Sequence, residues 1–192
     1  MNKLSKNVSH ALVSFGFVVT GIVTLLTPWV SLDSGKSNVG HDGAKSDTAE
    51  MSCKELDDAD FLKSNDACSI QTVILLFGSL SVIVAAGLCA YMLLQEKNKA
   101  SYDLSVKVGV KLGHGFIFLS SVIQFACIWA YCDLFEDTSA KQVVGAAFYI
   151  CIIELVASGI VNVGISRFGF EFLKPVVENG TPEEKEKAAD NL

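Results

Sequence analysis

The residue types that most often do catalytic chemistry are scattered along this chain. Its three histidines, His10, His41 and His114, are far apart, so no pair has the short spacing of a helix-borne metal site. The chain contains no H-E-x-x-H, no G-x-S-x-G, no C-x-x-C and no glycine-rich phosphate-binding loop. These absences argue against the hydrolases, metalloproteases and thiol oxidoreductases that carry such motifs. They predict a protein without enzymatic activity, without a metal and without a cofactor.

Glu154 is a charged residue at the centre of an apolar stretch, residues 142–166. A carboxylate in hydrocarbon is costly, so this group should be protonated, hydrogen-bonded or next to water. Counting depth at about 1.5 Å per residue places Gln124 about 3 Å from the depth of Glu154, and His114 level with Asn162. Both matches predict a packed antiparallel contact between the third and fourth apolar stretches. Structural hydrogen bonding within a bundle is the preferred interpretation. A proton or ion relay and contact with a partner protein are the alternatives.

A cluster of acidic residues occupies one polar segment of the chain. Its members are Glu55, Asp57, Asp58 and Asp60. Such a cluster either keeps a loop solvated or attracts cations to the mouth of a pore, as rings of carboxylates do in cation channels. The calcium-binding loop pattern of an EF-hand is absent, so calcium binding is not predicted.

The elements that must position these groups follow from the composition. Of 192 residues, 51% are hydrophobic and 19% are charged, which leaves too few polar side chains to cover a water-facing surface. Crossing a bilayer takes about 20 mostly apolar residues. Four stretches are long enough, namely residues 11–30, 70–94, 112–132 and 142–166. The predicted fold is therefore an all-α membrane bundle of four transmembrane helices, with no room for a large soluble domain.

The charges of the connecting segments predict the orientation, because cytoplasmic flanks retain Lys and Arg. Residues 1–10 and 95–111 have an excess of lysine, whereas residues 31–69 and 133–141 have an excess of acidic side chains. Both termini, including the tail 167–192, are therefore expected in the cytoplasm. The two acidic segments become extracellular loops. The first apolar stretch is too long for a cleaved signal peptide and is interpreted as an anchor.

Cysteine positions fit this topology. Of six cysteines, Cys53 and Cys68 are the pair that lies within the large extracellular loop, an oxidising compartment. A disulfide bond between them would close a short ring and stabilise it by roughly 3 kcal/mol. The other cysteines are expected to be packing residues or, at the end of the third span, a free thiol: Cys89, Cys127, Cys151 and Cys132.

The order of several short motifs resembles a known family. Thr27-Pro28-Trp29 ends the first apolar stretch, and the loop cysteines follow, the second of them just before the second stretch. The third stretch ends Ile128-Trp129-Ala130-Tyr131, and the fourth opens Gly145-Ala146-Ala147-Phe148. This order resembles the claudin and peripheral myelin protein superfamily of four-span proteins, or a fungal or protist claudin-like relative such as the eisosome tetraspans or amastins.

The resemblance implies a distant claudin-like protein whose family aromatic, just outside the first span, is Trp29. It also implies that the two loop cysteines pair and that the first extracellular loop forms a small β-sheet. The loop itself is poor in aromatic and β-branched residues, so its composition alone does not predict strands.

Two functional classes remain. The first is a non-enzymatic plasma-membrane tetraspan that acts by lateral assembly in membrane-domain organisation or cell contact. Its partners would be membrane lipid, further copies of itself, and other tetraspan or channel proteins. The second is a cation-selective pore, or an auxiliary subunit of a channel or transporter. A nucleic-acid partner is excluded by the membrane setting and a formal net charge of -6.

Overall fold

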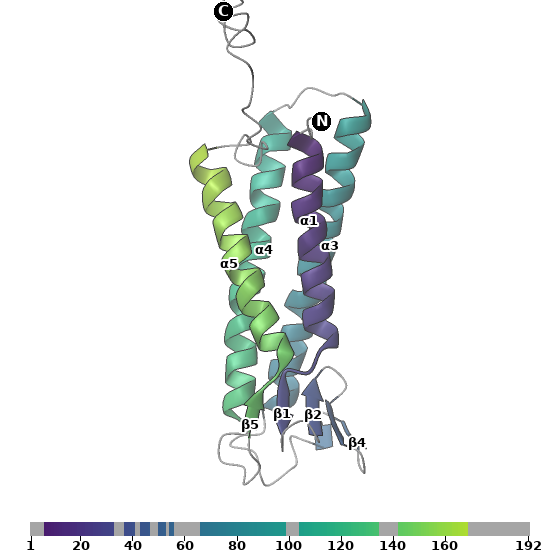
Figure 1. Ribbon diagram of the computed structural model, residues 1–192, viewed down its shortest axis with the longest axis vertical. Helices are drawn as coiled ribbons and strands as arrows, with labels where there is room; N and C mark the ends of the chain where they lie inside the picture. The colour runs from purple at the N-terminus through teal and green to yellow at the C-terminus, as the bar shows by residue number, and fades with distance from the viewer. Residues whose placement is uncertain are drawn as a thin grey trace, which may run out of the picture.

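The computed structural model describes residues 6–32, 37–40, 43–46, 50–52, 54–55, 66–98, 104–134 and 142–168. These residues form an elongated helical bundle with a small antiparallel sheet at one end (Figure 1). The described helices are α1 (Lys6–Leu26), α3 (Ala67–Asn98), α4 (Leu104–Asp133) and α5 (Ala146–Phe168). The start of α1 and the end of α5 lie at the end of the bundle opposite the sheet, which we call the terminal end.

All four helices are long and apolar enough to cross a membrane. The candidate spans within them are Asn7–Leu26, Ala67–Lys97, Lys107–Asp133 and Ala146–Phe168. The chain is therefore a four-span membrane protein, as the apolar stretches predicted. At 1.5 Å per residue, even the shortest of these helices is about 30 Å long, the thickness of a bilayer core.

At two of the predicted span boundaries the structure has a strand where a helix was expected. Residues 142–144, assigned to the fourth span, form strand β5, and the fourth helix begins only at Ala146. The first span, predicted to reach residue 30, ends at Leu26, and Val30 begins strand β1. Val and Leu side chains fit both a buried strand and a helix, so apolar content alone does not separate the two.

The buried residues of each helix recur at alternating spacings of three and four. In α1 these include Asn7, His10, Ser14, Phe17 and Thr24; in α3, Gln71, Ile74, Ser81, Ala85 and Met92; in α4, Val110, His114, Ile117, Ser121, Gln124, Ile128 and Tyr131; in α5, Ala147, Cys151, Glu154, Ser158, Val161 and Ile165. This seven-residue period is typical of left-handed helix bundles. We call these inward positions, taken together, the seam. Around it α1 packs against α3 and α5, and α4 also packs against α3 and α5.

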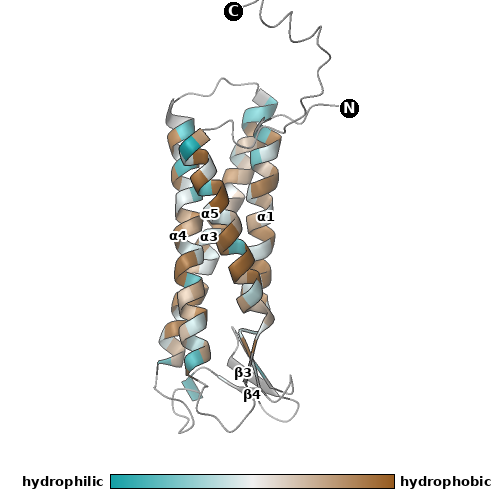
Figure 2. Cartoon of the chain, turned by 60° about the vertical axis from the view of Figure 1, so that its left-hand side comes forward, coloured by the Kyte–Doolittle hydropathy of each residue, from teal (hydrophilic) through white to brown (hydrophobic). Residues whose placement is uncertain are grey.

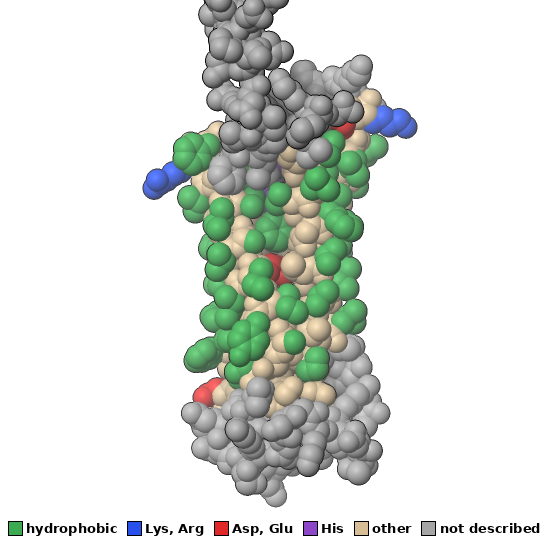
Figure 3. All heavy atoms as spheres, in the orientation of Figure 1, with side chains coloured by type: hydrophobic (Ala, Val, Ile, Leu, Met, Phe, Trp, Pro, Cys, Tyr) green, Lys and Arg blue, Asp and Glu red, His purple; other side chains and the backbone are tan. Residues whose placement is uncertain are grey.

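The seam contains most of the buried polar residues, whereas the outer surface is apolar. Large side chains such as Leu12, Phe15, Ile83 and Ile153 are exposed on the outside of the helices. Hydrophobic residues predominate along all four helices (Figure 2), and on the face in view hydrophobic side chains cover the length of the bundle (Figure 3). This pattern suits a protein whose surroundings are lipid rather than water.

The sheet has five strands in the order β4-β3-β2-β1-β5, and every neighbouring pair is antiparallel. The strands are β1 (Val30–Leu32), β2 (Ser37–Gly40), β3 (Gly43–Ser46), β4 (Glu50–Met51) and β5 (Gln142–Val144). Four come from the segment between the first two spans, and β5 comes from the segment between the last two. A sheet in the first loop was implied by the resemblance. The contribution of the second loop was not expected.

Candidate functional site

Trp29 joins the first helix to the sheet. Its side chain is fully buried, and its indole Nε1 donates a hydrogen bond to the main-chain oxygen of Thr24 at 3.1 Å. Its main-chain nitrogen donates to the oxygen of Val39 in β2 at 2.8 Å. The helix ends just before this residue because Pro28 disfavours a helical conformation at Thr27 and provides no N–H donor. Trp29 is therefore a structural residue at the junction of bundle and sheet.

The second loop is tied to the same point through Gly145. Its N–H donates to the main-chain oxygen of Trp29 at 2.9 Å, and the N–H of Ala147 donates to the oxygen of Pro28 at 3.2 Å. A Cβ atom at position 145 would lie 2.6 Å from the carbonyl carbon of Trp29 and would also contact the oxygen of Pro28. Only glycine allows the two main chains to approach this closely.

The sheet end of the bundle is closed by a mostly hydrophobic cluster, which we call the sheet-end cluster. It includes Trp29, Val39, Ile74, Ile128, Tyr131, Ala147, Phe148 and Cys151. The rings of Trp29 and Tyr131 meet edge to face within it, with centroids 5.5 Å apart. No charged side chain belongs to this cluster among the residues that the structure describes. The cluster holds the helix ends and the first strand together through apolar packing.

Glu154 lies in the middle of the seam and is 1% exposed. Its carboxyl oxygen Oε1 lies 3.2 Å from the hydroxyl of Ser121 on α4, and the carboxyl also hydrogen-bonds with Thr20 on α1. The predicted pairing with Gln124 was wrong, because the amide of Gln124 donates instead to the oxygen of Ser120 at 3.4 Å. Ser121 lies one turn from Gln124 on α4. The predicted depth of the partner of Glu154 was therefore correct to about one helical turn, but the predicted partner residue was wrong.

His114 is buried in the seam nearer the termini. The centroid of its ring lies 6.1 Å from the ring centroid of His10 and 6.3 Å from that of Phe17, both on α1. The predicted partner Asn162 contacts the neighbouring position instead: its Oδ1 lies 3.9 Å from where a Cβ of Gly115 would be. The pairing of His114 with Asn162 was therefore wrong by one residue, which on a helix is a rotation of about 100°.

Several seam residues were missed by the sequence analysis. Asn7 and His10 precede the predicted first span, yet both are buried, and Asn7 donates to the carboxylate of Glu96 on α3 at 3.0 Å. Thr20 and Ser121, the partners of Glu154, were also not singled out. The alternating spacing of polar residues along α1 was the signal that could have identified the inward face.

The acidic cluster is described only at its first member. Glu55 is exposed and accepts hydrogen bonds from the N–H of Ser52 at 2.6 Å and from its hydroxyl at 2.8 Å, while the N–H of Glu55 donates to the Ser52 hydroxyl at 3.4 Å. This reciprocal arrangement is a capping box. The main-chain and side-chain hydrogen bonds from Ser52 lower the pKa of Glu55. Asp57, Asp58 and Asp60 lie outside the described residues.

The cysteines divide into two groups. Cys68 is disulfide-bonded. Its predicted partner, Cys53, lies outside the described residues, so the pairing stays a prediction. Within the described residues, four cysteines form no disulfide bond: Cys89, Cys127, Cys132 and Cys151. Among the residues with described positions, no group of three or more His, Cys, Asp or Glu side chains could hold a metal ion.

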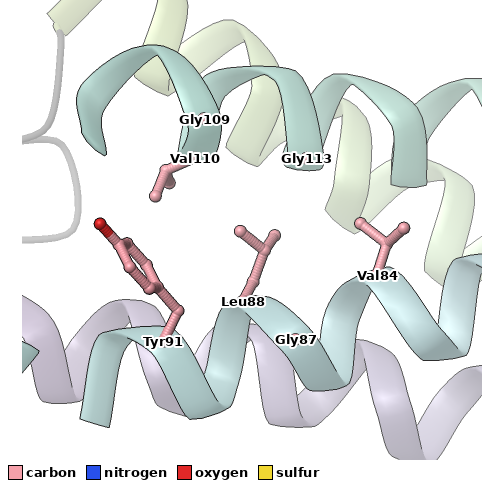
Figure 4. Close-up of a pocket in the computed structure, with 7 residues that line it drawn as sticks. All are labelled: Val84, Gly87, Leu88, Tyr91, Gly109, Val110 and Gly113. Carbon is pink, nitrogen blue, oxygen red and sulfur yellow. The ribbon is translucent and has the colours of Figure 1, made fainter. Parts of the chain in front are cut away.

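A pocket of about 360 Å³ lies between α3 and α4. Val84, Leu88 and Tyr91 project from α3 toward the part of α4 that carries Gly109 and Gly113 (Figure 4). The lining is apolar apart from the phenol of Tyr91, so the pocket lacks the convergent polar groups of a typical catalytic site.

Comparison of the chain with protein-family models, with curated proteins and with solved structures found no match.

Proposed function

We propose that this chain is a non-enzymatic plasma-membrane protein of the claudin-like kind, which acts by lateral assembly to organise membrane domains or cell contacts. The observation that carries the proposal is the pairing of β1 with β5, in which Val30 lies opposite Val144. Through this pairing the loop between the first two spans and the loop between the last two spans contribute to one sheet. Trp29 and Gly145 anchor that sheet directly on the helices. A sheet held in this way presents a fixed surface to a neighbouring protein.

The sheet also provides a means of contact. Its outer strands, β4 and β5, pair on one side only within the part of the chain that the structure describes. Unpaired main-chain N–H and C=O groups at a sheet edge are templates for another extended segment. The outer faces of the helices are apolar and can pack against a neighbouring copy in the bilayer, where van der Waals contact rather than the hydrophobic effect favours association.

The proposed orientation places the sheet outside the cell and both termini in the cytoplasm. Lys97, Lys107 and Arg167 are exposed on the ends of helices next to the termini, whereas Asp66 and Asp133 lie next to the sheet. This is the charge asymmetry expected when Lys and Arg stay on the cytoplasmic side. The same orientation exposes Cys68 and Cys53 to an oxidising compartment, which favours a disulfide bond between them.

Assembly is tested by expressing two differently tagged copies in one cell and isolating one tag in mild detergent. Recovery of the second tag is expected for the wild type. Asn38→Pro removes a main-chain donor at the position opposite Ser31 in the sheet and should reduce recovery. Asn38→Ala removes only the side-chain hydrogen bond with Ser31 and serves as the matched control. Equal recovery from all three proteins, or none from the wild type, contradicts the proposal.

A cation-selective pore or a channel auxiliary subunit is the alternative function. A pore through a single bundle is disfavoured by the sheet-end cluster, which fills one end with apolar side chains. A conducting path would then run between copies, near Asp57, Asp58 and Asp60. Replacing these three residues by Asn should lower the ratio of cation to anion permeability if that path exists, most clearly at low salt. Co-purification of a single large channel with the tagged protein would favour the auxiliary subunit.

A further inference from the structure

The seam contains more hydrogen-bonding atoms than the protein itself satisfies. Both ring nitrogens of His114, the hydroxyl of Ser14 and the second carboxyl oxygen of Glu154, Oε2, are buried without a hydrogen-bond partner. A buried polar atom without a partner costs free energy, and a surrounding bilayer provides no water from outside. Groups of this kind in protein interiors are commonly served by internal water.

The geometry around Glu154 indicates that its carboxyl group holds a proton. The hydroxyl of Ser121 has one hydrogen, and its shorter contact is with the main-chain oxygen of Ile117 at 2.9 Å. The hydroxyl of Thr20 likewise donates to the oxygen of Phe17 at 3.3 Å. The Ser121 hydroxyl also donates toward Oε1 of Glu154 at 3.2 Å, so it is shared between the carboxyl group and a main-chain oxygen. The buried residues that the structure describes include no Lys or Arg that could pair with a carboxylate, and the neutral carboxyl group needs no counter-charge.

Polar groups continue from Glu154 toward the termini. Ser121 and His114 are seven residues apart on α4, a rise of about 10 Å. On α1, Ser14 and His10 follow Thr20 along the same inward face, and Asn7 ends the row. An apolar layer that includes Phe17, Ala85 and Ile117 lies between the histidines and Glu154, so a proton must pass it to reach the carboxyl group.

The opposite direction is less favourable for a proton. Beyond Thr24 and Gln124 the seam enters the sheet-end cluster, where Ile74, Ile128 and Phe148 fill the interior. The two directions from Glu154 therefore differ, with a polar row on the side of the termini and an apolar seal on the side of the sheet.

We propose that Glu154 is a binding site for one exchangeable proton, which enters and leaves through the terminal end of the bundle past His114 and His10. This activity is additional to lateral assembly and does not depend on it. The titratable groups that face the path are His10 from α1, His114 from α4, and Cys151 beside Glu154 from α5. From α3, the carboxylate of Glu96 lies at the terminal end of the path, where it accepts a hydrogen bond from Asn7. The buried residues described for α3 include no ionisable side chain.

The test is infrared spectroscopy of the full chain in lipid nanodiscs. A protonated carboxyl has a C=O band distinct from that of a carboxylate, and the band shifts when its proton is replaced by deuterium. The band of Glu154 is assigned by its loss in Glu154→Gln. In the wild type at neutral pH we expect this band to be present and to shift after transfer to D2O.

Two matched variants test by which end of the bundle the proton reaches Glu154. His114→Leu removes the polar group on the terminal side and should slow the exchange by about tenfold or more. Thr24→Val removes a buried hydroxyl on the sheet side with little change of shape and should leave the rate unchanged. Circular dichroism of each variant confirms that the helices are retained, and His114→Gln, which keeps polar atoms at this position, should exchange faster than His114→Leu.

Several outcomes overturn the proposal. They are absence of the protonated band, a band that does not shift in D2O, an exchange rate in His114→Leu equal to that of the wild type, and exchange slowed as much in Thr24→Val as in His114→Leu. Loss of the band on adding Na⁺ at constant pH also contradicts it, because the ligand would then be a metal cation rather than a proton.

Discussion

The ring of Trp29 meets the ring of Tyr131 edge to face, with centroids 5.5 Å apart and an interplanar angle of 89°. Trp29 follows the first span and Tyr131 is near the end of the third, so this contact joins segments about one hundred residues apart at the point where the sheet begins. Edge-to-face pairs add about 0.5–1.5 kcal/mol beyond the area that they bury. The contact makes the junction of bundle and sheet a fixed point of the molecule.

Replacing Trp29 should therefore be costly. Trp29→Ala is expected to lower the free energy of unfolding by about 3–5 kcal/mol, because it leaves a large cavity. Trp29→Phe keeps most of the ring but loses the hydrogen bond to Thr24, with a cost of about 1–2 kcal/mol. Trp129→Phe is the control, since that side chain is 63% exposed on the outside of α4. Reversible unfolding in mixed micelles measures the stability of all three variants. Equal losses for Trp29→Phe and Trp129→Phe would contradict the structural role of Trp29.

Gly145→Ala should destabilise the sheet. The added Cβ would press on main-chain atoms of Pro28 and Trp29, which cannot move aside as a flexible side chain can. Overpacking of this kind typically costs about 1–3 kcal/mol. Gly16→Ala in α1 is the control, because its Cβ would meet nothing within 4 Å. A melting temperature of Gly145→Ala equal to that of the wild type would show that the main chains are farther apart than the structure places them.

The cysteines should label in two groups. In the unfolded, unreduced protein we expect alkylation of four thiols, those of Cys89, Cys127, Cys132 and Cys151. After reduction, two more, those of Cys53 and Cys68, should react. Mass spectrometry of tryptic peptides identifies each site. A modified Cys53 in the unreduced sample would assign Cys68 a different partner.

Glu55 should titrate below its usual range, because Ser52 donates two hydrogen bonds to the carboxylate. A group whose pKa is lowered on folding stabilises the fold above its unfolded-state pKa, and this contribution is lost as pH falls through the folded-state pKa. Ser52→Ala removes the hydroxyl donor and keeps the main-chain donor, so it should raise the pKa of Glu55 part of the way to 4.5. Carboxyl carbon NMR titration measures the shift, and identical titrations of the two proteins would contradict the capping box.

The orientation is tested by glycosylation in a eukaryotic cell. The sequons at Asn7 and Asn179 should remain unmodified, since both are on the proposed cytoplasmic side and Asn7 is also buried and bonded to Glu96. Ser46→Asn places an acceptor two residues before Thr48, in the sheet region, and should gain a glycan. Lys99→Asn places one two residues before Ser101, between the second and third spans, and should not. The reverse pattern would invert the topology.

The four spans were predictable because the bilayer imposes a length and a composition on any helix that crosses it. The sequence also limited the depth of Glu154, since depth follows from position along a helix. The boundary near Val143 and Val144 was not predictable, because these residues suit a helix as well as a strand. Their pairing with β1, and the close approach allowed by Gly145, select the strand.

By itself, the sequence determined the number of spans, their approximate limits and the polar residues that each one carries. Only the tertiary structure decided which of these residues meet. A residue's position along a helix sets its depth, but its direction depends on how that helix is rotated against its neighbours, and one residue turns the direction by about 100°. For this reason Glu154 contacts Ser121 and Thr20 rather than Gln124, and His114 contacts His10 rather than Asn162.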